Sequence, residues 1–497
     1  MLSKKDISEK KNMSTISLKK TLNIKQVFEE FDSLELGKNT DLTTIYGWVR
    51  TCRSSSSILG FCNINDGSNV KGIQVVLSDK YLDEDKIQEF FKNVRTGVYL
   101  NCKGKIIVSP AQGQKYEMQL REYEIKGQVD DSYPLAKSRM KLDVLRNFTH
   151  LRCRTNTFGS IFRIRSSLSK ILHDFYHERD FLHLDPNIIT VNECEGGAGV
   201  FQLTEKDITH IDKLPIDKET NHYDWGSDHF CRPAYLTVSS QLHLEAMACG
   251  MGNVYTINKS FRSEHSSSSK HVSEFTHLEI EIINNKFEDL MDISEEMIKY
   301  CITKLFEQRE SDFINLNKFV SKGLIDKLRF LQEAEFKRVK YSDIIEEINI
   351  DISKKKKLKL PMLKFGDDLE SAHENYITEK YKTAVFVTHW PKSLKSFYMK
   401  QCEDETCESF DLLVPFGIGE LIGASQREDD YLKLSNMMDI KGINKKDMEF
   451  YLDLRKYGSC PHGGFGLGFD RLLMLMTGMS NIKDVIPFPV FYKSCKY

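Results

Sequence analysis

Two runs of alternating apolar and polar residues flank a serine-rich loop and form the clearest pattern in the chain. They cover residues 253–282, NVYTINKSFRSEHSSSSKHVSEFTHLEIEI, with the loop over 264–270. Such alternation is typical of half-buried strands, so the pattern predicts a β-hairpin with a long tip. Side chains alternate between the two faces of a strand, which places Arg262 and Glu264 together. On the return strand the same rule groups every second residue from Phe275 to Glu281.

The face defined in this way carries a guanidinium, carboxylates and an aromatic ring. An arginine can bind phosphate oxygens, a ring can stack on a base, and a carboxylate can accept a hydrogen bond from an exocyclic amine. The set therefore suits a nucleotide. The alternative is an amphipathic hairpin whose charged side chains simply face water, as most strand charges do.

Shorter strand-like segments fill the region before the hairpin. They lie at residues 43–50, 60–66, 72–77, 98–107 and 116–125, with turns between them. Five short strands over this length suit an OB-type β-barrel, which binds single-stranded nucleic acid on its face. Arg50, Arg53 and Phe61 would supply cations and a stacking surface there.

Helical spacing takes over after residue 158. Apolar residues at i, i+3 and i+4 predict a strongly amphipathic helix. They are Ile161, Ile164, Leu168, Ile171, Leu172 and Phe175. Further helical runs occupy about residues 288–350.

Composition narrows the class of protein. The chain of 497 residues is 40% hydrophobic and 29% charged, typical of a soluble globular protein of more than one domain. Its formal charge of −2 gives no global basic field, so a nucleic-acid partner would be met by local patches. The 12 cysteines include no C-x-x-C pair, which argues against a disulfide framework or zinc site and fits a reducing compartment. No apolar run approaches the length of a membrane span.

A glycine-rich stretch lies near the C-terminus. Residues 458–471, GSCPHGGFGLGFDR, place Gly464, Gly466 and Gly468 at alternate positions ahead of an Asp-Arg pair. Glycine at every second position leaves one face of a strand bare, so a flat group can lie against the backbone. The run is not the G-x-G-x-x-G that opens a helix in dinucleotide-binding folds. Taken alone, it also fits a turn or a packing device.

The hairpin and the glycine run together resemble motifs 2 and 3 of class II aminoacyl-tRNA synthetases. Motif 2, F-R-x-E, a loop and H-x-x-E-F, is matched by residues 261–264 and 271–275, and motif 3 by residues 464–471. Four further segments are similar to asparaginyl-tRNA synthetases. They are YPLAKSRMKLDVLRNFTHLRCRTNTFG (133–159), TVSSQLHLE (237–245), KSFYMK (395–400) and GIGELIGASQRE (417–428).

This resemblance implies an α+β fold, with an N-terminal OB-type β-barrel followed by the class II synthetase antiparallel sheet flanked by helices. The implied domains are a lysine-rich extension (1–40), an anticodon-binding barrel (41–129), a hinge (130–157) and a catalytic domain (158–497). The extension would be a solvated tail or an arm that touches tRNA. The segment around the first long helix resembles motif 1, which builds the dimer interface in this class, so a homodimer is expected.

The implied activity is ATP-dependent ligation of L-asparagine to tRNA(Asn) through an asparaginyl-adenylate, in the cytoplasm. Positioning and charge neutralisation dominate such phosphoryl chemistry, so Arg262 and Arg471 are the expected catalytic residues. The ATP-binding residues would be Arg262, Glu264, His271, Phe275, Glu420, Gly468 and Arg471. Glu420 and Asp411 would bind Mg²⁺ on the ATP phosphates.

The resemblance also assigns residues to the amino acid and to the anticodon. The amino-acid site would contain Glu195, Gln241, Glu279 and Arg427, and the anticodon site Arg50, Phe61 and Gln74. Asparagine and aspartate are nearly isosteric, so the site must distinguish an amide from a carboxylate. Glu279 can accept from the amide nitrogen and repel an aspartate carboxylate. Arg427 can donate to the amide oxygen but would also accept a carboxylate, so it discriminates poorly.

Other functions stay open at this point. An aspartyl-tRNA synthetase would share most of these motifs but tends to carry Asp where Glu279 stands. An ATP-dependent amide ligase or an RNA-binding paralogue could use the same scaffold. The predicted barrel argues against a free-standing ligase, and intact Arg262 and Arg471 argue against an inactive paralogue.

Overall fold

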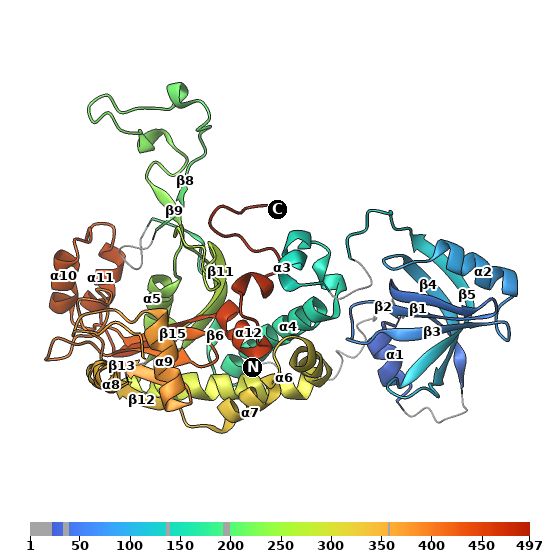
Figure 1. Cartoon of the computed structure of the whole chain (residues 1–497). Helices are drawn as coiled ribbons and strands as arrows, with labels where there is room; N and C mark the ends of the chain where they lie inside the picture. Colours follow the sequence, from blue (N-terminus) through green and yellow to red (C-terminus); the bar gives the residue numbers. More distant parts are fainter. Residues whose placement is uncertain (1–21, 33–38, 136–139, 192–198, 356–357) are drawn as a thin grey trace, which may run out of the picture. The chain divides into compact units, whose positions relative to one another are not determined.

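Five strands close into a barrel in the first of two units into which the chain divides. The computed structural model describes residues 22–32, 39–135, 140–191, 199–355 and 358–497. The units are Met1–Gly159 and Ser160–Tyr497 (Figure 1). The barrel strands are β1 (Asn39–Ser56), β2 (Leu59–Asn65), β3 (Ile73–Ser78), β4 (Tyr99–Val108) and β5 (Tyr116–Gly127), closed in the order β1-β2-β3-β5-β4. The predicted five-stranded barrel is confirmed.

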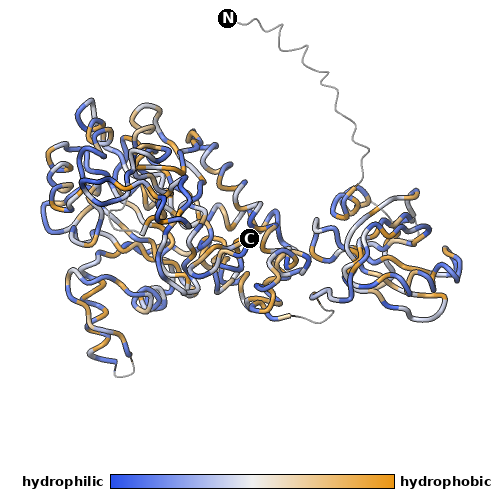
Figure 2. Tube along the Cα trace, turned by 90° about the horizontal axis from the view of Figure 1, so that it is seen from above, coloured by the Kyte–Doolittle hydropathy of each residue, from blue (hydrophilic) through white to orange (hydrophobic). Residues whose placement is uncertain are grey.

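The barrel closes because every second residue of its strands is apolar and points inward. Figure 2 shows this alternation as short bands of orange and blue along the trace. Helix α1 (Ile24–Glu30) adds Ile24 and Val27 to the same core. A capping box between Asn23 and Gln26 fixes the start of α1, which satisfies backbone donors that the first turn leaves unpaired. The end of the lysine-rich segment is therefore part of the barrel core, and α2 (Glu84–Asn93) packs on β1 and β3.

The second unit is built on an 8-stranded sheet of order β12-β13-β14-β15-β16-β11-β10-β6. Its strands are β12 (Lys337–Lys340), β13 (Val385–Thr388), β14 (Ser409–Val414), β15 (Gly419–Gln426), β16 (His462–Gly468), β11 (Glu274–Ile283), β10 (Val254–Phe261) and β6 (Leu182–His183). The inner strands are antiparallel as predicted. The outermost pairs, β12 with β13 and β6 with β10, are parallel, so the sheet is mixed. A separate small sheet joins β7 (Ile189–Thr190), β9 (Ala234–Leu236) and β8 (Gln202–Leu203).

Helices of the second unit cover the sheet. They are α4 (Asn156–His177), α5 (Gln241–Met251), α6 (Phe287–Phe319), α7 (Leu324–Glu333), α8 (Tyr341–Lys354), α9 (Ser371–Tyr381), α10 (Tyr431–Ile440), α11 (Glu449–Lys456) and α12 (Phe469–Thr477), after a short α3 (Leu142–Leu145) in the connection from the barrel. The six apolar residues that predicted an amphipathic α4 are all buried. The predicted helical run over 288–350 is interrupted by strand β12. Among the described helices, none combines the length and apolar character needed to span a bilayer.

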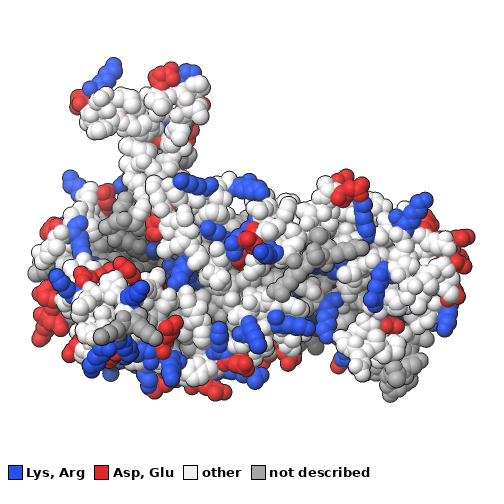
Figure 3. Space-filling model, in the orientation of Figure 1, with Lys and Arg blue, Asp and Glu red and all other residues white. Residues whose placement is uncertain are grey.

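The predicted hairpin is present as β10 and β11 of this sheet. The strands pair antiparallel with Thr256 opposite Glu279 and Asn258 opposite His277. On its other side β11 pairs with β16, which places Gly466 opposite Glu279 and Gly464 opposite Glu281. The hairpin and the glycine run are therefore neighbours in the sheet. On the face seen in Figure 3, acidic and basic groups are interspersed, in line with the small net charge.

Candidate functional site

Two adjoining cavities open on the face of the sheet formed by β11, β15 and β16. The first is lined by the hairpin loop, these strands and the first turn of α12, and the second by the start of α5, residues 394–399 and the same strands. Arg262, His277, Glu420, Gly423 and Gly466 line both cavities. The two spaces therefore share a wall, with a guanidinium and a carboxylate at the junction.

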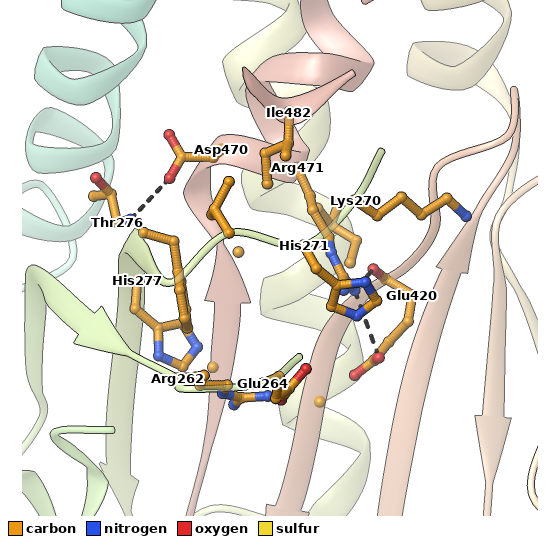
Figure 4. Close-up of a pocket in the computed structure, with 16 residues that line it drawn as sticks. Arg262, Glu264, Lys270, His271, Thr276, His277, Glu420, Asp470, Arg471 and Ile482 are labelled. Carbon is orange, nitrogen blue, oxygen red and sulfur yellow. Dashed lines mark hydrogen bonds and ion pairs between the residues drawn. The ribbon is translucent and has the colours of Figure 1, made fainter. Parts of the chain in front are cut away.

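Arg262 and Arg471 both line the first cavity, although they lie far apart along the chain. Arg262 directly follows β10, and its guanidinium carbon lies 5.6 Å from the centre of the Phe275 ring. Arg471 lies in the first turn of α12, and its Nη1 donates to the backbone carbonyl of Glu420 over 2.7 Å. Figure 4 shows both guanidinium groups directed into the same space, with Glu264, His271 and Glu420 around them. The expected convergence of the two arginines is thus observed.

Asp470 sets the position of α12 against the hairpin. Its carboxylate accepts a hydrogen bond of 2.8 Å from the backbone N–H of Thr276 on β11, drawn as a dashed line in Figure 4. The same carboxylate, 2% exposed, pairs with Arg165 of α4. The Asp-Arg pair that follows the glycines therefore has divided roles, since Asp470 anchors the helix and Arg471 points into the cavity.

Two carboxylates converge beside Gly423 at the boundary of the cavities. Glu420 Oε1 and Asp411 Oδ1 lie 3.5 and 3.9 Å from the position of a Cβ on Gly423. Lys395 Nζ lies 2.7 Å from both oxygens of Asp411. Burial raises the pKa of Asp411 to about 6, while Lys395 opposes the shift and Glu420 adds to it. Burial would also raise the pKa of Glu420, but the surrounding cations, Arg471 foremost, hold it below its usual value.

This carboxylate pair fits a hard cation that takes further ligands from a substrate. No group of three or more metal-binding side chains occurs within the residues the structure describes. Mg²⁺ is commonly held by one or two carboxylates together with substrate phosphates. Glu420 and Asp411 match that donor set.

The loop of the hairpin contributes His271 to the first cavity. Its Nδ1 lies 2.5 Å from the hydroxyl of Ser268. Burial and the nearby Arg471 lower the pKa of His271, so its neutral form is favoured. Burial likewise lowers the pKa of Lys270.

Two of the alternate glycines of β16 leave room for atoms of the neighbouring strand β11. A Cβ on Gly464 would lie 2.1 Å from the carbonyl oxygen of Ile280 and 2.5 Å from Glu281 Oε1. One on Gly466 would lie 2.6 Å from His277 Nε2. The expectation that a flat ligand lies against this bare face is therefore wrong at Gly464, where the backbone of Ile280 and the side chain of Glu281 fill the space. Gly466, beside His277, still lines both cavities. The nearest atoms to a Cβ on Gly468 belong to the side chain of Arg471, at 3.5 Å or more, and Gly468 lines the first cavity.

Glu279 lies in the wall of the second cavity and is held by the start of α5. Its carboxylate accepts hydrogen bonds from the Ser239 hydroxyl and from the Ser240 backbone N–H, the latter at 2.9 Å. Its side chain is 3% exposed. Glu279 therefore enters the cavity as a fixed acceptor rather than as a solvated strand carboxylate.

Arg427 faces the same cavity as one half of a buried ion pair. It pairs with Glu281, with Nε 3.3 Å from Glu281 Oε2, and its Nη1 donates to the Ser425 hydroxyl over 2.9 Å. The guanidinium carbon lies 5.3 Å from the centre of the Tyr398 ring. Burial would lower the pKa of Arg427, but Glu281 and Glu245 outweigh it, so the arginine stays charged. Its charge is balanced before any ligand arrives.

On the barrel, Phe61 and Gln74, two of the residues predicted to read an anticodon, are half-buried on neighbouring strands. Gln74 lies opposite Asn63, two residues along β2 from Phe61. Phe61 lies opposite Arg53, whose guanidinium carbon is 5.3 Å from the ring centre. Arg50 lies beside an irregularity in the pairing of β1 with β2. The group forms a half-exposed surface with a ring and a cation.

Several residues of the site were not assigned by sequence reasoning. They are His277, Glu281, Lys395 and Glu245. His277 and Glu281 share the strand face already marked by Glu279, so their period of two was a usable signal. Lys395 and Glu245 lie in segments that resemble the family, but no local pattern indicated their contacts, because their partners lie far away along the chain. Gln241 lines the second cavity, whereas the predicted Glu195 lies outside the described residues.

Comparison with known proteins gives one consistent result. A family model described as tRNA synthetases class II (D, K and N) matches residues 141–491, and one described as an OB-fold nucleic acid binding domain matches residues 43–126. The chain is 42% identical over 450 residues to the asparagine–tRNA ligase of Bacteroides fragilis (strain YCH46), covering 90% of this chain and 94% of that protein. It is 39% identical over 477 residues to the asparagine–tRNA ligase of Clostridium kluyveri, covering 95% and 98%.

Solved structures agree with the sequence comparison. The crystal structure of asparaginyl-tRNA synthetase from Pyrococcus horikoshii complexed with asparaginyl-adenylate is similar with a TM-score of 0.78 and 29% identity, covering 91% of this chain and 96% of that one. The Entamoeba histolytica asparaginyl-tRNA synthetase in complex with asparaginyl-adenylate gives a TM-score of 0.76 and 25% identity, with 92% and 96% covered. Both proteins match over the barrel as well as the sheet.

Proposed function

Because this chain belongs to the class II tRNA synthetases of the D, K and N group, we propose that it ligates L-asparagine to tRNA(Asn) through an asparaginyl-adenylate. The carboxylate of asparagine attacks the α-phosphorus of ATP, and pyrophosphate leaves. A terminal hydroxyl of the tRNA then attacks the asparaginyl carbonyl carbon, and AMP leaves. ATP is therefore consumed as a substrate.

The observation that carries this proposal is the shared wall of the two cavities. A nucleotide in the first and an amino acid in the second would meet at Arg262, which lines both. Its guanidinium can bind a phosphate oxygen and the attacking carboxylate together. In the transition state the negative charge is spread over the oxygens around the α-phosphorus, so a fixed cation there lowers the barrier while it aligns the reactants.

The other residues of the first cavity suit the remaining parts of ATP. Phe275 supplies a ring on which adenine can stack, and Glu264 can accept from the adenine amine. Arg471 would bind the γ-phosphate, and His271 would contact the phosphate tail. Gly468 leaves the backbone open for close approach. None of these contacts moves a proton, in keeping with catalysis by positioning.

Glu420 and Asp411 would hold Mg²⁺ against the phosphates. The bound ion would supply positive charge to the phosphate oxygens. Lys395 neutralises Asp411 in the structure and so keeps two adjacent carboxylates compatible with burial. The backbone carbonyl of Glu420 separately receives Arg471, which couples this carboxylate to the position of the arginine.

The second cavity has the groups needed to select asparagine. Glu279 is a fixed acceptor for the amide nitrogen, and its charge would repel the carboxylate of aspartate. Arg427 can donate to the amide oxygen. Because Glu281 balances its charge, Arg427 attracts a carboxylate less than a lone arginine would. Gln241, together with Glu195, would bind the α-amino end of the substrate.

The barrel would read the anticodon. Phe61 offers a ring to an unstacked base, Gln74 offers an amide to a base edge, and Arg50 a cation to the backbone. The match of residues 43–126 to an OB-fold nucleic acid binding domain supports this role.

Two further features support a homodimer and a cytoplasmic location. Within the described residues, β6 has a strand neighbour on one side only, and the nearby Leu182 and Ile189 are 43% and 44% exposed. An open edge with exposed apolar groups is a suitable surface for a second copy. All eleven cysteines of the described segments are free thiols, which suits a reducing compartment.

Amino-acid-dependent exchange of labelled pyrophosphate into ATP tests the first step directly. We expect exchange with asparagine and little with aspartate, followed by charging of tRNA(Asn). Equal exchange with both amino acids would instead support a non-discriminating aspartyl enzyme. Absence of exchange with either would contradict the synthetase proposal itself.

A further inference from the structure

A buried carboxylate, Glu245, lies directly behind the second cavity and has two sets of partners. It is fully buried on α5, one turn after Gln241. Its Oε1 accepts a hydrogen bond of 2.9 Å from Gln241 Nε2 and lies 3.7 Å from Arg427 Nε. Its Oε2 receives a second group of donors. They are the Tyr451 hydroxyl at 2.6 Å, Arg455 Nη2 at 2.9 Å and His462 Nε2 at 3.1 Å.

The charges around Glu245 keep it ionised. Burial alone would raise its pKa, but Arg455 and the neighbouring His462 and Arg427 hold the pKa of Glu245 well below its usual range. An ionised carboxylate has acceptor sites only, so whatever faces it must be a donor. The amide of Gln241 is therefore turned with its NH₂ towards Glu245.

This orientation decides what Gln241 offers to a ligand. With the NH₂ bound to Glu245, the carbonyl oxygen is the polar end left to the second cavity, which Gln241 lines. A carbonyl oxygen is an acceptor and suits a substrate ammonium. A flipped amide would present a donor and repel the same group.

We propose that Glu245 is a positioning residue for the amino-acid substrate, which fixes Gln241 with its carbonyl oxygen towards the α-ammonium group. The inference rests on the proposed function, because it assumes that an amino acid occupies the second cavity. Glu245 does not itself line either cavity, so it acts through Gln241.

The two oxygens of Glu245 allow this role to be separated from a purely structural one. Oε2 joins α5 to Tyr451 and Arg455 of α11 and contributes to stability. Oε1 faces Gln241 and the substrate side. Tyr451→Phe removes a hydrogen bond at Oε2 only, whereas Glu245→Gln allows the Gln241 amide to turn over.

The test is a double-mutant cycle of Glu245→Gln and Gln241→Leu in asparagine-dependent pyrophosphate exchange. Loss of a hydrogen bond to a charged group costs about 10-fold to 100-fold in binding. We expect Glu245→Gln to raise the KM for asparagine by about that factor, with the KM for ATP changed less than about twofold. The double variant should be no worse than the more severe single variant, because both remove the same interaction.

Factors that multiply in the double variant would overturn the inference. We expect Tyr451→Phe to lower Tm and to leave the KM for asparagine unchanged. If Tyr451→Phe raised this KM as much as Glu245→Gln does, the effect would be a general loss of structure and the inference would be overturned. If Glu245→Gln does not fold, Glu245→Asp can replace it, because the shorter side chain keeps the buried charge but withdraws it from Gln241. Glu245→Asp should give the same rise in the KM for asparagine, and an unchanged KM would overturn the inference. Wild-type protein without asparagine-dependent exchange would instead contradict the proposed function.

Discussion

The carboxylate of Glu279 accepts a hydrogen bond of 2.9 Å from the backbone N–H of Ser240, the residue before α5. Backbone donors at a helix start are unpaired within the helix and favour a negative charge. The interaction fixes Glu279 at the edge of the second cavity before a substrate binds. Glu279 of β11, which we propose distinguishes amide from carboxylate, is thus bound to the same start of α5 that carries Gln241.

Replacing Glu279 by Gln should weaken the choice between asparagine and aspartate. The substitution keeps the shape but removes the charge that repels an aspartate carboxylate. We expect the ratio of kcat/KM for asparagine over aspartate to fall by about 10-fold or more in pyrophosphate exchange. Glu335→Gln is the control, because Glu335 pairs with Lys337 at the surface and lines neither cavity. An unchanged ratio in Glu279→Gln would contradict the assignment.

Local periodicity was enough to predict the barrel strands, the hairpin and α4, because each depends on residues close in sequence. Strand β12 was missed for a physical reason. Its sequence Lys-Arg-Val-Lys has three cations in four residues, and it forms because the backbone of β13 lies alongside it. Nothing within the segment itself distinguishes such an edge strand from the helices on either side.

In the site, too, features set by local sequence were predicted and features set by tertiary packing were not. Strand alternation placed Glu279 in the cavity wall, but not that Ser240 holds it. Alternate glycines were correctly taken as a bare strand face. The sequence did not reveal that Glu281 and His277 occupy that face, since register between β11 and β16 is decided by the whole sheet. Pairs such as Lys395 with Asp411 depend on tertiary packing and leave no local signal.

Arg262 should be intolerant of lysine as well as alanine. A planar guanidinium can bind two oxygen ligands at once, whereas an ammonium acts as a point charge. We expect Arg262→Ala to lower kcat for exchange by about 100-fold or more, and Arg262→Lys to recover only part of that loss. Arg338→Lys on the exposed edge strand β12 serves as the control and should leave kcat unchanged. Full activity in Arg262→Lys would mean that charge alone suffices there.

Gly464→Ala should lower the stability of the protein, whereas Gly468→Ala should not. The Cβ at Gly464 would overlap the carbonyl oxygen of Ile280 at 2.1 Å, and backbone cannot move aside cheaply. We expect Gly464→Ala to cost about 1–3 kcal/mol or more of stability, visible as a lower Tm. At Gly468 the atoms nearest to the new methyl group would be those of the flexible Arg471 side chain at 3.5 Å, so Tm should hold. Equal losses at both positions would argue against the observed register of β16.

The pKa of His271 should report nucleotide binding. In the free protein, burial and then Arg471 lower its pKa below the usual 6.5. The neutral form of His271 is therefore favoured in the folded state. As the pH falls below the pKa of this histidine in the unfolded chain, the unfolded chain takes up the proton more readily, so the folded state loses stability. Phosphate groups bound at Arg471 would offset that cation, so ATP should raise the pKa of His271. A histidine NMR titration, assigned with His271→Gln, measures the shift, and a fall on adding ATP would contradict the proposed contact.

Phe61→Ala should separate tRNA recognition from amino-acid activation. A base stacked on an aromatic ring contributes about 1–3 kcal/mol, so we expect the KM for tRNA(Asn) in the charging assay to rise by about 10-fold. Pyrophosphate exchange without tRNA should be unchanged, because the sites proposed for its substrates lie on the sheet of the second unit. Tyr46→Ala is the matched control, since Tyr46 is a half-exposed ring on the β4 side of β1, away from Phe61. If both variants raise the KM equally, the effect is a loss of barrel stability. If neither does, the proposed contact of Phe61 with the anticodon is contradicted.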